Sequence, residues 1–329
     1  MILKELLLLF GGLGLIWGGA EVLVRYASRL ARSMGVSPLV IGLTIISVGT
    51  SIPELVVCVM AAIQKEIGIS IGNIVGSNIA NLGLILGVGA MITPLVIHTR
   101  WVKKEVPFMI AVTILFVVMG LTGKSINRVE GIILLGFLSV ALFYVAKFTI
   151  NEITEFQEIA REEANGISPP TITPRKLLYF FLTLVGLALL IAGSKIAVDS
   201  GSTLARLLGV SNTIIGLTLI AIGTSLPELA TTIVSAFRKE ADLALGNVIG
   251  SNIVNITLIG GVTATIHPIP VTEEFSMLMF DFGALIFLTL LVWPLMKMRQ
   301  SMNRYEGVFL LFFYAAFLML SISFSQAPF

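Results

Sequence analysis

One polar motif is written twice in this chain, each time inside strongly apolar sequence. The first copy reads GLTIISVGTSIPEL and then GNIVGSNIANL, and the second reads GLTLIAIGTSLPEL and then GNVIGSNIVNI. The offset between the copies is constant, since Glu54 and Glu228 lie 174 positions apart, as do Asn81 and Asn255. An internal repeat of this length determines the architecture, because each copy forms the same structural unit. The chain is therefore expected to contain two copies of one unit.

The composition predicts that this unit lies in a membrane. Hydrophobic residues make up 56% of the 329 residues and charged residues only 12%, with a mean hydropathy of +1.00. Soluble domains carry roughly 25% charged residues. Apolar runs of about 20 residues, enough to cross a bilayer as helices, recur along the chain, and the alternating pattern of a membrane barrel is missing. The expected fold class is an all-α polytopic membrane protein with ten transmembrane helices, at 5–27, 38–64, 69–96, 106–122, 129–148, 177–200, 212–237, 243–266, 275–296 and 305–325.

The two repeats are expected to have opposite orientations in the membrane. Residues 1–148 form the first five-helix repeat, 177–329 form the second, and 149–176 form a linker with an acidic helical piece and a Pro-rich end. An odd number of spans in each repeat inverts the second relative to the first. Most of the 21 Lys and Arg residues fall on the side of the linker, which the positive-inside rule identifies as cytoplasmic. Both termini are then outside, and inverted repeats are typical of alternating-access transporters with a site near the midplane.

The polar residues of the motif predict an ion site on a broken helix. Pro53 has no N–H group and its ring clashes with the preceding turn, so the helix should break there and leave carbonyl oxygens around Ser47 and Gly49 free. Thr50 and Glu54 are four residues apart and therefore share one helix face. The second part of each motif spaces its polar residues in the same way: Asn73, Ser77 and Asn81 in the first copy, and Asn247, Ser251 and Asn255 in the second.

The duplicated oxygen-bearing residues indicate a site for hard cations. Pseudo-symmetry would bring Glu54 and Glu228 together, surrounded by hydroxyl, amide and carbonyl oxygens and without sulfur or imidazole. Such donors suit Ca²⁺ or Na⁺ and disfavour zinc or copper. Two ionised glutamates in an empty site are costly to expose to hydrocarbon. One Ca²⁺ or two Na⁺ would neutralise them, so a loaded carrier should switch more easily than an empty one. This arithmetic favours exchange.

At these residues the chain resembles a known family. GTS[IL]PEL followed by GN[IV][VI]GSNI-x-N is similar to the α-repeats of the sodium/calcium exchanger family, within the cation/Ca²⁺ antiporter superfamily. The resemblance covers both halves and implies ten helices in an inverted five-plus-five arrangement. It also implies Na⁺-driven Ca²⁺ exchange at four adjacent cation sites, with the first and sixth helices sliding across the core. The chain would be a secondary active transporter, not an enzyme, and would need no cofactor.

The resemblance assigns a role to individual residues. Glu54 and Glu228 would be ligands shared by Ca²⁺ and Na⁺, and Thr50, Thr224, Ser77 and Ser251 would add hydroxyl oxygens. Backbone carbonyls near Ser47 and Ala221 would complete the outer sites. Asn81 and Asn255 would flank the middle site, and Ser51 and Ser225 would line the approaches.

One position departs from the family pattern. Well-known relatives carry an acidic residue where this chain has Asn255, which weakens any case for K⁺ co-transport. The large cytoplasmic regulatory domain of the animal exchangers is missing too. The expected location is a prokaryotic cell membrane, and the expected partners are Ca²⁺, Na⁺ and the lipid bilayer, with a monomeric chain and no nucleic acid.

Three other functions remain open on the sequence. H⁺-coupled Ca²⁺ exchange would use the same glutamates, although the proton-coupled branch usually carries a glutamate shortly after its GN motif and this chain has none there. A cation channel would use the oxygens as a filter, but channels normally gain their pore from oligomer symmetry. A non-transporting membrane scaffold would bind Ca²⁺ without flux.

Two further features are predicted to be structural. Asn-x-x-Glu at 127–130 and at 303–306 should cap the fifth and tenth spans, in the manner of a capping box. Cys58 aligns with Thr232 in the other copy and is expected to serve packing.

Overall fold

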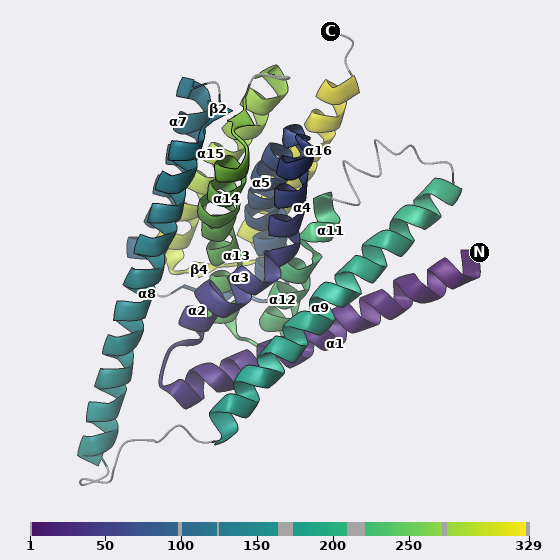
Figure 1. Cartoon of the computed structure of the whole chain (residues 1–329). Helices are drawn as coiled ribbons and strands as arrows, with labels where there is room; N and C mark the ends of the chain where they lie inside the picture. The colour runs from purple at the N-terminus through teal and green to yellow at the C-terminus, as the bar shows by residue number, and fades with distance from the viewer. Residues whose placement is uncertain are drawn as a thin grey trace.

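The computed structural model describes residues 2–97, 101–123, 125–163, 174–208, 221–271 and 275–326 (Figure 1). Within these residues eight helices are long and apolar enough to cross a membrane, and two more helices form a ninth span bent by 42°. The shorter apolar helix α12 lies where the repeat requires the tenth span. The expected span 212–237 begins in residues 209–220, which lie outside the described residues. The predicted all-α polytopic membrane fold is confirmed.

The helices of the two repeats correspond in order. The first repeat contains α1 (Ile2–Met34), α2 (Pro38–Ile41), η1 (Gly42–Ile46), α3 (Ser47–Thr50), α4 (Ile52–Gln64), α5 (Ile67–Ala80), η2 (Asn81–Ile85), α6 (Leu86–Ile92), η3 (Trp101–Glu105), α7 (Val106–Gly123) and α8 (Arg128–Glu163). The second contains α9 (Pro174–Leu207), α11 (Ala221–Thr224), α12 (Leu226–Phe237), α13 (Ala241–Val254), η5 (Asn255–Ile259), α14 (Gly260–Ile266), α15 (Phe275–Arg299) and α16 (Arg304–Gln326). The segments labelled η are π-helical turns.

The first helix of each repeat packs against its counterpart. α1 and α9 run side by side in opposite directions and cross the remaining bundle obliquely (Figure 1). Glycines allow their backbones to touch: a Cβ atom on Gly19 would lie 2.6 Å from the backbone nitrogen of Leu190, and one on Gly186 would lie 2.5 Å from that of Leu23. Small residues permit this close approach between membrane helices. Equivalent helices that run antiparallel agree with the inverted repeat.

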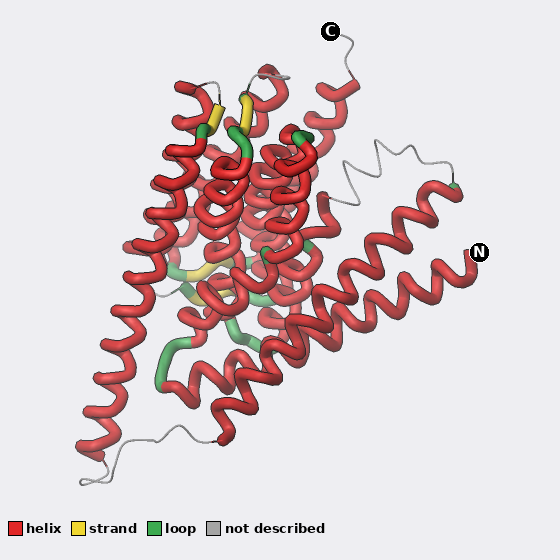
Figure 2. The backbone as a smooth tube through the Cα atoms, in the orientation of Figure 1, coloured by secondary structure: helices red, strands yellow, loops and turns green. Residues whose placement is uncertain are grey.

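Two short antiparallel ladders connect the repeats. β1 (Leu95–Val96) pairs with β4 (Ser301–Met302), and β2 (Ser125–Ile126) pairs with β3 (Ile269–Pro270). One ladder lies at the top of the view in Figure 2 and the other near its middle. β1 and β3 are equivalent in the repeat, as are β2 and β4, so each ladder takes one strand from each half.

The apolar side chains divide into a core and a lipid-facing surface. The larger core cluster fills the space between α5–α7 and α13–α16, where Phe116 meets Phe282 edge to face with ring centroids 6.4 Å apart. A smaller cluster joins α1 and α9 to α2 and α12. Large apolar side chains also remain uncovered on the outer helices, such as Phe10 at 66%, Phe143 at 71% and Phe312 at 73% exposure. Exposed apolar surface on this scale requires lipid as its solvent.

Both predicted capping boxes are confirmed. The side-chain oxygen of Asn127 accepts from the backbone N–H of Val129 at 2.9 Å, and the backbone N–H of Asn127 donates to Glu130 at 2.8 Å. The equivalent bonds at Asn303 are 2.9 and 2.7 Å. The caps fix where α8 and α16 begin. α8 then continues to Glu163, well past the expected end of its span at residue 148.

Ion pairs fasten α1 to the junction between α12 and α13. Arg238 donates two hydrogen bonds to Glu21, and Glu21 also accepts from Arg25 at 3.3 Å. Glu240 accepts from Arg32 at 2.5 Å and from Ser28 at 2.6 Å. The charged end of α1 is therefore attached to the second repeat.

Candidate cation site

In both copies of the motif the helix breaks at the serine that follows the threonine of GTS. Ser51 (φ −84°, ψ 7°) separates α3 from α4, and Ser225 (φ −90°, ψ 8°) separates α11 from α12. Pro53 and Pro227 occupy the first turn of the following helix, where a missing N–H group is tolerated. The predicted break at Pro53 is confirmed as the 42° bend.

Each break buries a glutamate in the middle of the bundle. Glu54 and Glu228 are both 1% exposed. The hydroxyl of Ser225 donates to Glu54 at 3.1 Å, and the hydroxyl of Ser51 donates to Glu228 at the same distance. The two carboxylates are also close enough for their negative charges to repel each other. Each carboxylate is therefore held by a serine from the other repeat, and the two carboxylates form one site.

Six buried oxygen atoms, two on this pair and four on predicted ligands of the neighbouring helices, have no hydrogen-bond partner among the described residues. They form three symmetry-related pairs, and all six side chains are at most 4% exposed. Buried polar atoms without partners are rare in native proteins and call for a ligand, a water or an ion. These atoms are Glu54 Oε2, Glu228 Oε2, Ser77 Oγ, Ser251 Oγ, Asn81 Oδ1 and Asn255 Oδ1.

The threonines before the breaks contact asparagines of the opposite repeat. Thr50 donates to Oδ1 of Asn247 at 3.1 Å, and Nδ2 of Asn73 lies 3.5 Å from the hydroxyl of Thr224. The side chains of Thr50 and Thr224 also lie beside Glu228 and Glu54, respectively. The sequence placed both asparagines on the polar face without predicting these contacts. The available signal was the G-N that opens the second part of each motif.

Of the remaining predicted residues, Ser47, Asn81 and Asn255 are buried. Ser47 is fully buried, and its carbonyl oxygen accepts from the backbone of Ser51 at 3.2 Å and from Thr50 at 3.4 Å. The prediction of a free carbonyl at Ser47 is therefore wrong, because the backbone N–H of Ser51 still reaches it before the helix breaks. Ala221 is the first residue of α11. Asn81 and Asn255 each open a π-helical turn, a distortion often found at functional sites. Nδ2 of Asn81 also lies 3.5 Å from Oδ1 of Asn252.

The chemistry of the site is that of oxygen donors. Within the described residues no third Asp, Glu, His or Cys joins the two carboxylates in a metal-holding cluster. Carboxylate, hydroxyl and amide oxygens remain, and these are the ligands of hard cations such as Ca²⁺. With both glutamates ionised, the site carries two negative charges that only cations can neutralise in place.

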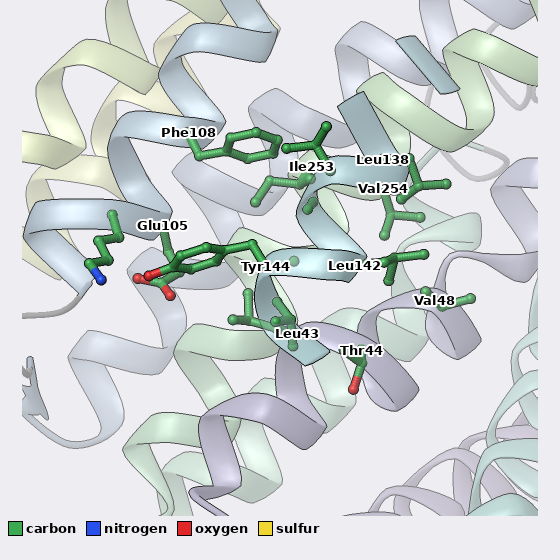
Figure 3. Close-up of a pocket in the computed structure, with 15 residues that line it drawn as sticks. Leu43, Thr44, Val48, Glu105, Phe108, Leu138, Leu142, Tyr144, Ile253 and Val254 are labelled. Atoms are coloured by element: carbon green, nitrogen blue, oxygen red, sulfur yellow. The ribbon is translucent and has the colours of Figure 1, made fainter. Parts of the chain in front are cut away.

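A separate cavity of about 410 Å³ lies beside the broken helix (Figure 3). Its walls are mostly apolar side chains from η1, α7, α8 and α13, including Leu43, Phe108, Leu142 and Ile253. None of the predicted ion ligands lines it. The candidate ligands are packed against one another and do not face this open volume.

Comparison with known proteins assigns the chain to a family. The family model described as "Sodium/calcium exchanger protein" matches residues 4–147 and 178–323. CaxA of Alkalimonas amylolytica is 38% identical over 323 residues, covering 94% of this chain and 96% of that protein. The sodium/calcium exchanger MaX1 of Methanosarcina acetivorans is 34% identical over 347 residues, covering 97% and 99%. A solved structure of the sodium-calcium exchanger NCX_Mj, soaked with Na⁺ and Sr²⁺, superposes with a TM-score of 0.81 at 28% identity and covers both chains completely. The chain is therefore a member of the sodium/calcium exchanger family.

Proposed function

We propose that this protein is a secondary antiporter that exchanges Na⁺ for Ca²⁺ by alternating access at the site of Glu54 and Glu228. The observation that carries the proposal is the set of six buried, unpartnered oxygen atoms, paired by the internal symmetry: two on the carboxylates and four on the other predicted ligands. A structural polar cluster would satisfy its own hydrogen bonds. A cluster that leaves its acceptors open in both halves is suited to ions that enter and leave.

The proposed ligands are those expected from the sequence. The two glutamates supply the charge, and the neutral ligands are the side chains of Thr50, Thr224, Ser77, Ser251, Asn81 and Asn255, with the carbonyls of Ser47 and Ala221. Ser51 and Ser225 orient the carboxylates through their hydrogen bonds. Because each glutamate depends on the opposite repeat, one chain supplies a complete site and a monomer suffices.

The charge of the site explains why transport would be coupled. An empty site with two buried negative charges pays a desolvation penalty of several kcal/mol whenever it passes through the occluded state. One Ca²⁺ or two Na⁺ remove the net charge, and a third Na⁺ leaves a single positive charge. The carrier therefore switches when loaded with either ion and stalls when empty, which produces exchange.

The proposed topology places the linker 149–176 in the cytoplasm and both termini outside, with repeats at 1–148 and 177–329. The basic side chains support this assignment. Arg25, Arg29, Arg32 and Arg238 gather at the end of the bundle where α1 ends and α12 meets α13. Positive charge concentrates on the cytoplasmic side of membrane proteins.

Uptake of radiolabelled Ca²⁺ into proteoliposomes tests the proposal. Vesicles loaded with Na⁺ should accumulate Ca²⁺, whereas vesicles loaded with K⁺ or choline at equal ionic strength should not. A third set with an imposed pH gradient and no Na⁺ examines proton coupling. Uptake driven only by the pH gradient would transfer the same glutamates to H⁺/Ca²⁺ exchange. Flux without any counter-ion would identify a channel, and the alternating-access argument would fail.

A further inference from the structure

The two copies differ chemically one turn beyond each glutamate. Cys58 follows Glu54 by four residues, and Thr232 follows Glu228 by four, so the two residues occupy equivalent positions. Both side chains are completely buried. Each contacts the asparagine that bonds to a threonine of the site. The difference between the thiol and the hydroxyl can therefore affect the proposed ligands Thr224 and Thr50 through the amide of one asparagine in each copy.

In the second copy the hydroxyl of Thr232 fixes the amide in one orientation. Nδ2 of Asn247 donates to Thr232 Oγ1 at 3.1 Å and to the backbone carbonyl of Glu228 at 3.0 Å. Both N–H groups are then used, and Oδ1 of Asn247 faces Thr50, which donates to it at 3.1 Å. The hydroxyl proton of Thr50 can therefore bond to Oδ1 of Asn247 or to the carbonyl of Ser47, and no described residue donates to the hydroxyl oxygen. Its lone pairs are open to a cation.

In the first copy the amide is turned end for end. A thiol is a weak acceptor but can donate. Sγ of Cys58 lies 3.5 Å from Oδ1 of Asn73 and 3.7 Å from the backbone carbonyl of Ser70, so the shorter contact is the one to Asn73. The amide nitrogen of Asn73 consequently faces the hydroxyl oxygen of Thr224 at 3.5 Å. The hydroxyl oxygen of Thr224 therefore faces an N–H donor, which the oxygen of Thr50 does not. Part of its capacity as a cation ligand is already occupied.

We propose that Asn73 and Asn247 are positioning residues, set by Cys58 and Thr232, that make Thr50 a better Na⁺ ligand than Thr224. The inference rests on the proposed function and adds an inequality between the two halves of the site. The difference between the two threonines should change the affinity for Na⁺ more than the affinity for Ca²⁺, because Ca²⁺ affinity is governed mainly by the number of charged ligands. The internal symmetry is therefore broken by a residue that does not itself touch the ion.

The repeat supplies two matched variants that should act in opposite directions. Cys58→Thr gives the amide nitrogen of Asn73 an acceptor and turns its amide oxygen toward Thr224, which removes an N–H donor from the hydroxyl oxygen of Thr224. Thr232→Cys does the reverse to Asn247 and Thr50. Neither change alters a proposed ligand, and each introduces a side chain that the other copy already accommodates.

Na⁺ titration of the purified protein measures the effect without requiring transport. The melting temperature of the protein in detergent is followed against Na⁺ at constant ionic strength, since a ligand that binds the folded state raises it. Cys58→Thr should lower the half-saturating Na⁺ concentration about fivefold, and Thr232→Cys should raise it about fivefold, the size expected for one neutral hydrogen bond. The double variant exchanges the two arrangements and should return close to the original value. Shifts in the same direction, or no shift in either variant, would overturn the proposal.

Radiolabelled Ca²⁺ uptake then separates affinity from turnover. In the single variants the half-saturating Na⁺ concentration should move while the maximal rate stays near that of the unaltered protein. A loss of maximal rate in all three variants would indicate packing damage and contradict a positioning role. If the unaltered protein binds Na⁺ but shows no Na⁺-driven flux, the proposed function fails while the titration still decides the inference.

Infrared spectroscopy examines the first link directly, because Cys58 is the one cysteine of the sequence. Its S–H stretching band should shift to higher frequency in Asn73→Leu, where the closer acceptor is removed and only the backbone carbonyl of Ser70 remains, 3.7 Å from Sγ. Asn247→Leu is the matched control and should leave the band in place. A band that does not respond to Asn73→Leu would refute the hydrogen bond on which the asymmetry depends.

Discussion

Replacing Glu228 by glutamine should abolish Ca²⁺ exchange while leaving the fold intact. Glutamine has the size of glutamate, and its amide oxygen can still accept the hydroxyl of Ser51 that now lies 3.1 Å from the carboxylate. The side chain of Glu228 is 1% exposed, so water cannot reach the site to solvate a bound cation in place of the missing carboxylate. The change therefore removes one negative charge and little else.

The expected loss follows from the burial of the pair. Removing one partner of a buried ion pair costs about 3–5 kcal/mol, and each 1.4 kcal/mol is tenfold in affinity. Ca²⁺ binding should therefore weaken by a factor between about 100 and several thousand. Na⁺ has half the charge, so its Coulomb attraction to the missing carboxylate is about half as large. The remaining single charge of Glu54 can still be neutralised by one Na⁺.

Two fluxes measured on the same proteoliposomes test this reasoning. Glu228→Gln should show no Na⁺-driven uptake of radiolabelled Ca²⁺ at concentrations that saturate the unaltered protein, yet should retain exchange of radiolabelled Na⁺ for Na⁺. Glu54→Gln should behave in the same way because the two positions are equivalent in the repeat. Asp281→Asn is the control, since Asp281 is also a membrane carboxylate in α15 but is not a proposed ligand. Normal Ca²⁺ uptake in either glutamine variant would refute the assignment of the site.

Further perturbations follow from the same geometry. Ser51→Ala and Ser225→Ala each remove a hydroxyl that donates to a carboxylate at 3.1 Å. A hydrogen bond to a charged group contributes about 1.5–3 kcal/mol, so the half-saturating Ca²⁺ concentration should rise at least about tenfold in both variants. Unequal effects would contradict the symmetric pairing. Gly19→Leu should lower the melting temperature and the transport rate, because even its Cβ would lie 2.6 Å from the backbone of α9; an unchanged melting temperature would argue against the close packing. To test the topology, intact cells are treated with an impermeant maleimide, which should label Leu3→Cys and should not label Gln157→Cys. The parent protein is the blank, because its Cys58 is buried. The opposite labelling pattern would invert the proposed orientation.

The sequence predicts the parts of this structure that depend on composition and local chemistry. Polar residues in membrane spans are costly and usually functional, so the motif around Glu54, together with its second copy, predicts the candidate site. Proline without an N–H group predicts the helix break, and Asn-x-x-Glu predicts the caps, because both effects act within one helical turn.

Other features depend on contacts between distant segments and could not be predicted in this way. The exchange of serines between Ser51–Glu228 and Ser225–Glu54 requires the relative position of two helices about 170 residues apart. The opposite orientations of the Asn73 and Asn247 amides follow from a thiol–hydroxyl difference whose importance appears only when the contacts are known. The two-residue strands are too short to carry a periodic signal.

The two ladders also constrain how the protein can be made. β1 at Leu95–Val96 finds its partner at Ser301–Met302, and β2 at Ser125–Ile126 finds its partner at Ile269–Pro270. The first repeat leaves the ribosome before either partner strand exists, and the long segment between them must be inserted before the ladders can close. The first half is thus an unfinished intermediate during biosynthesis rather than an independent domain. Its assembly is completed by the last third of the chain, so truncations there should leave the early helices in the membrane without a native arrangement.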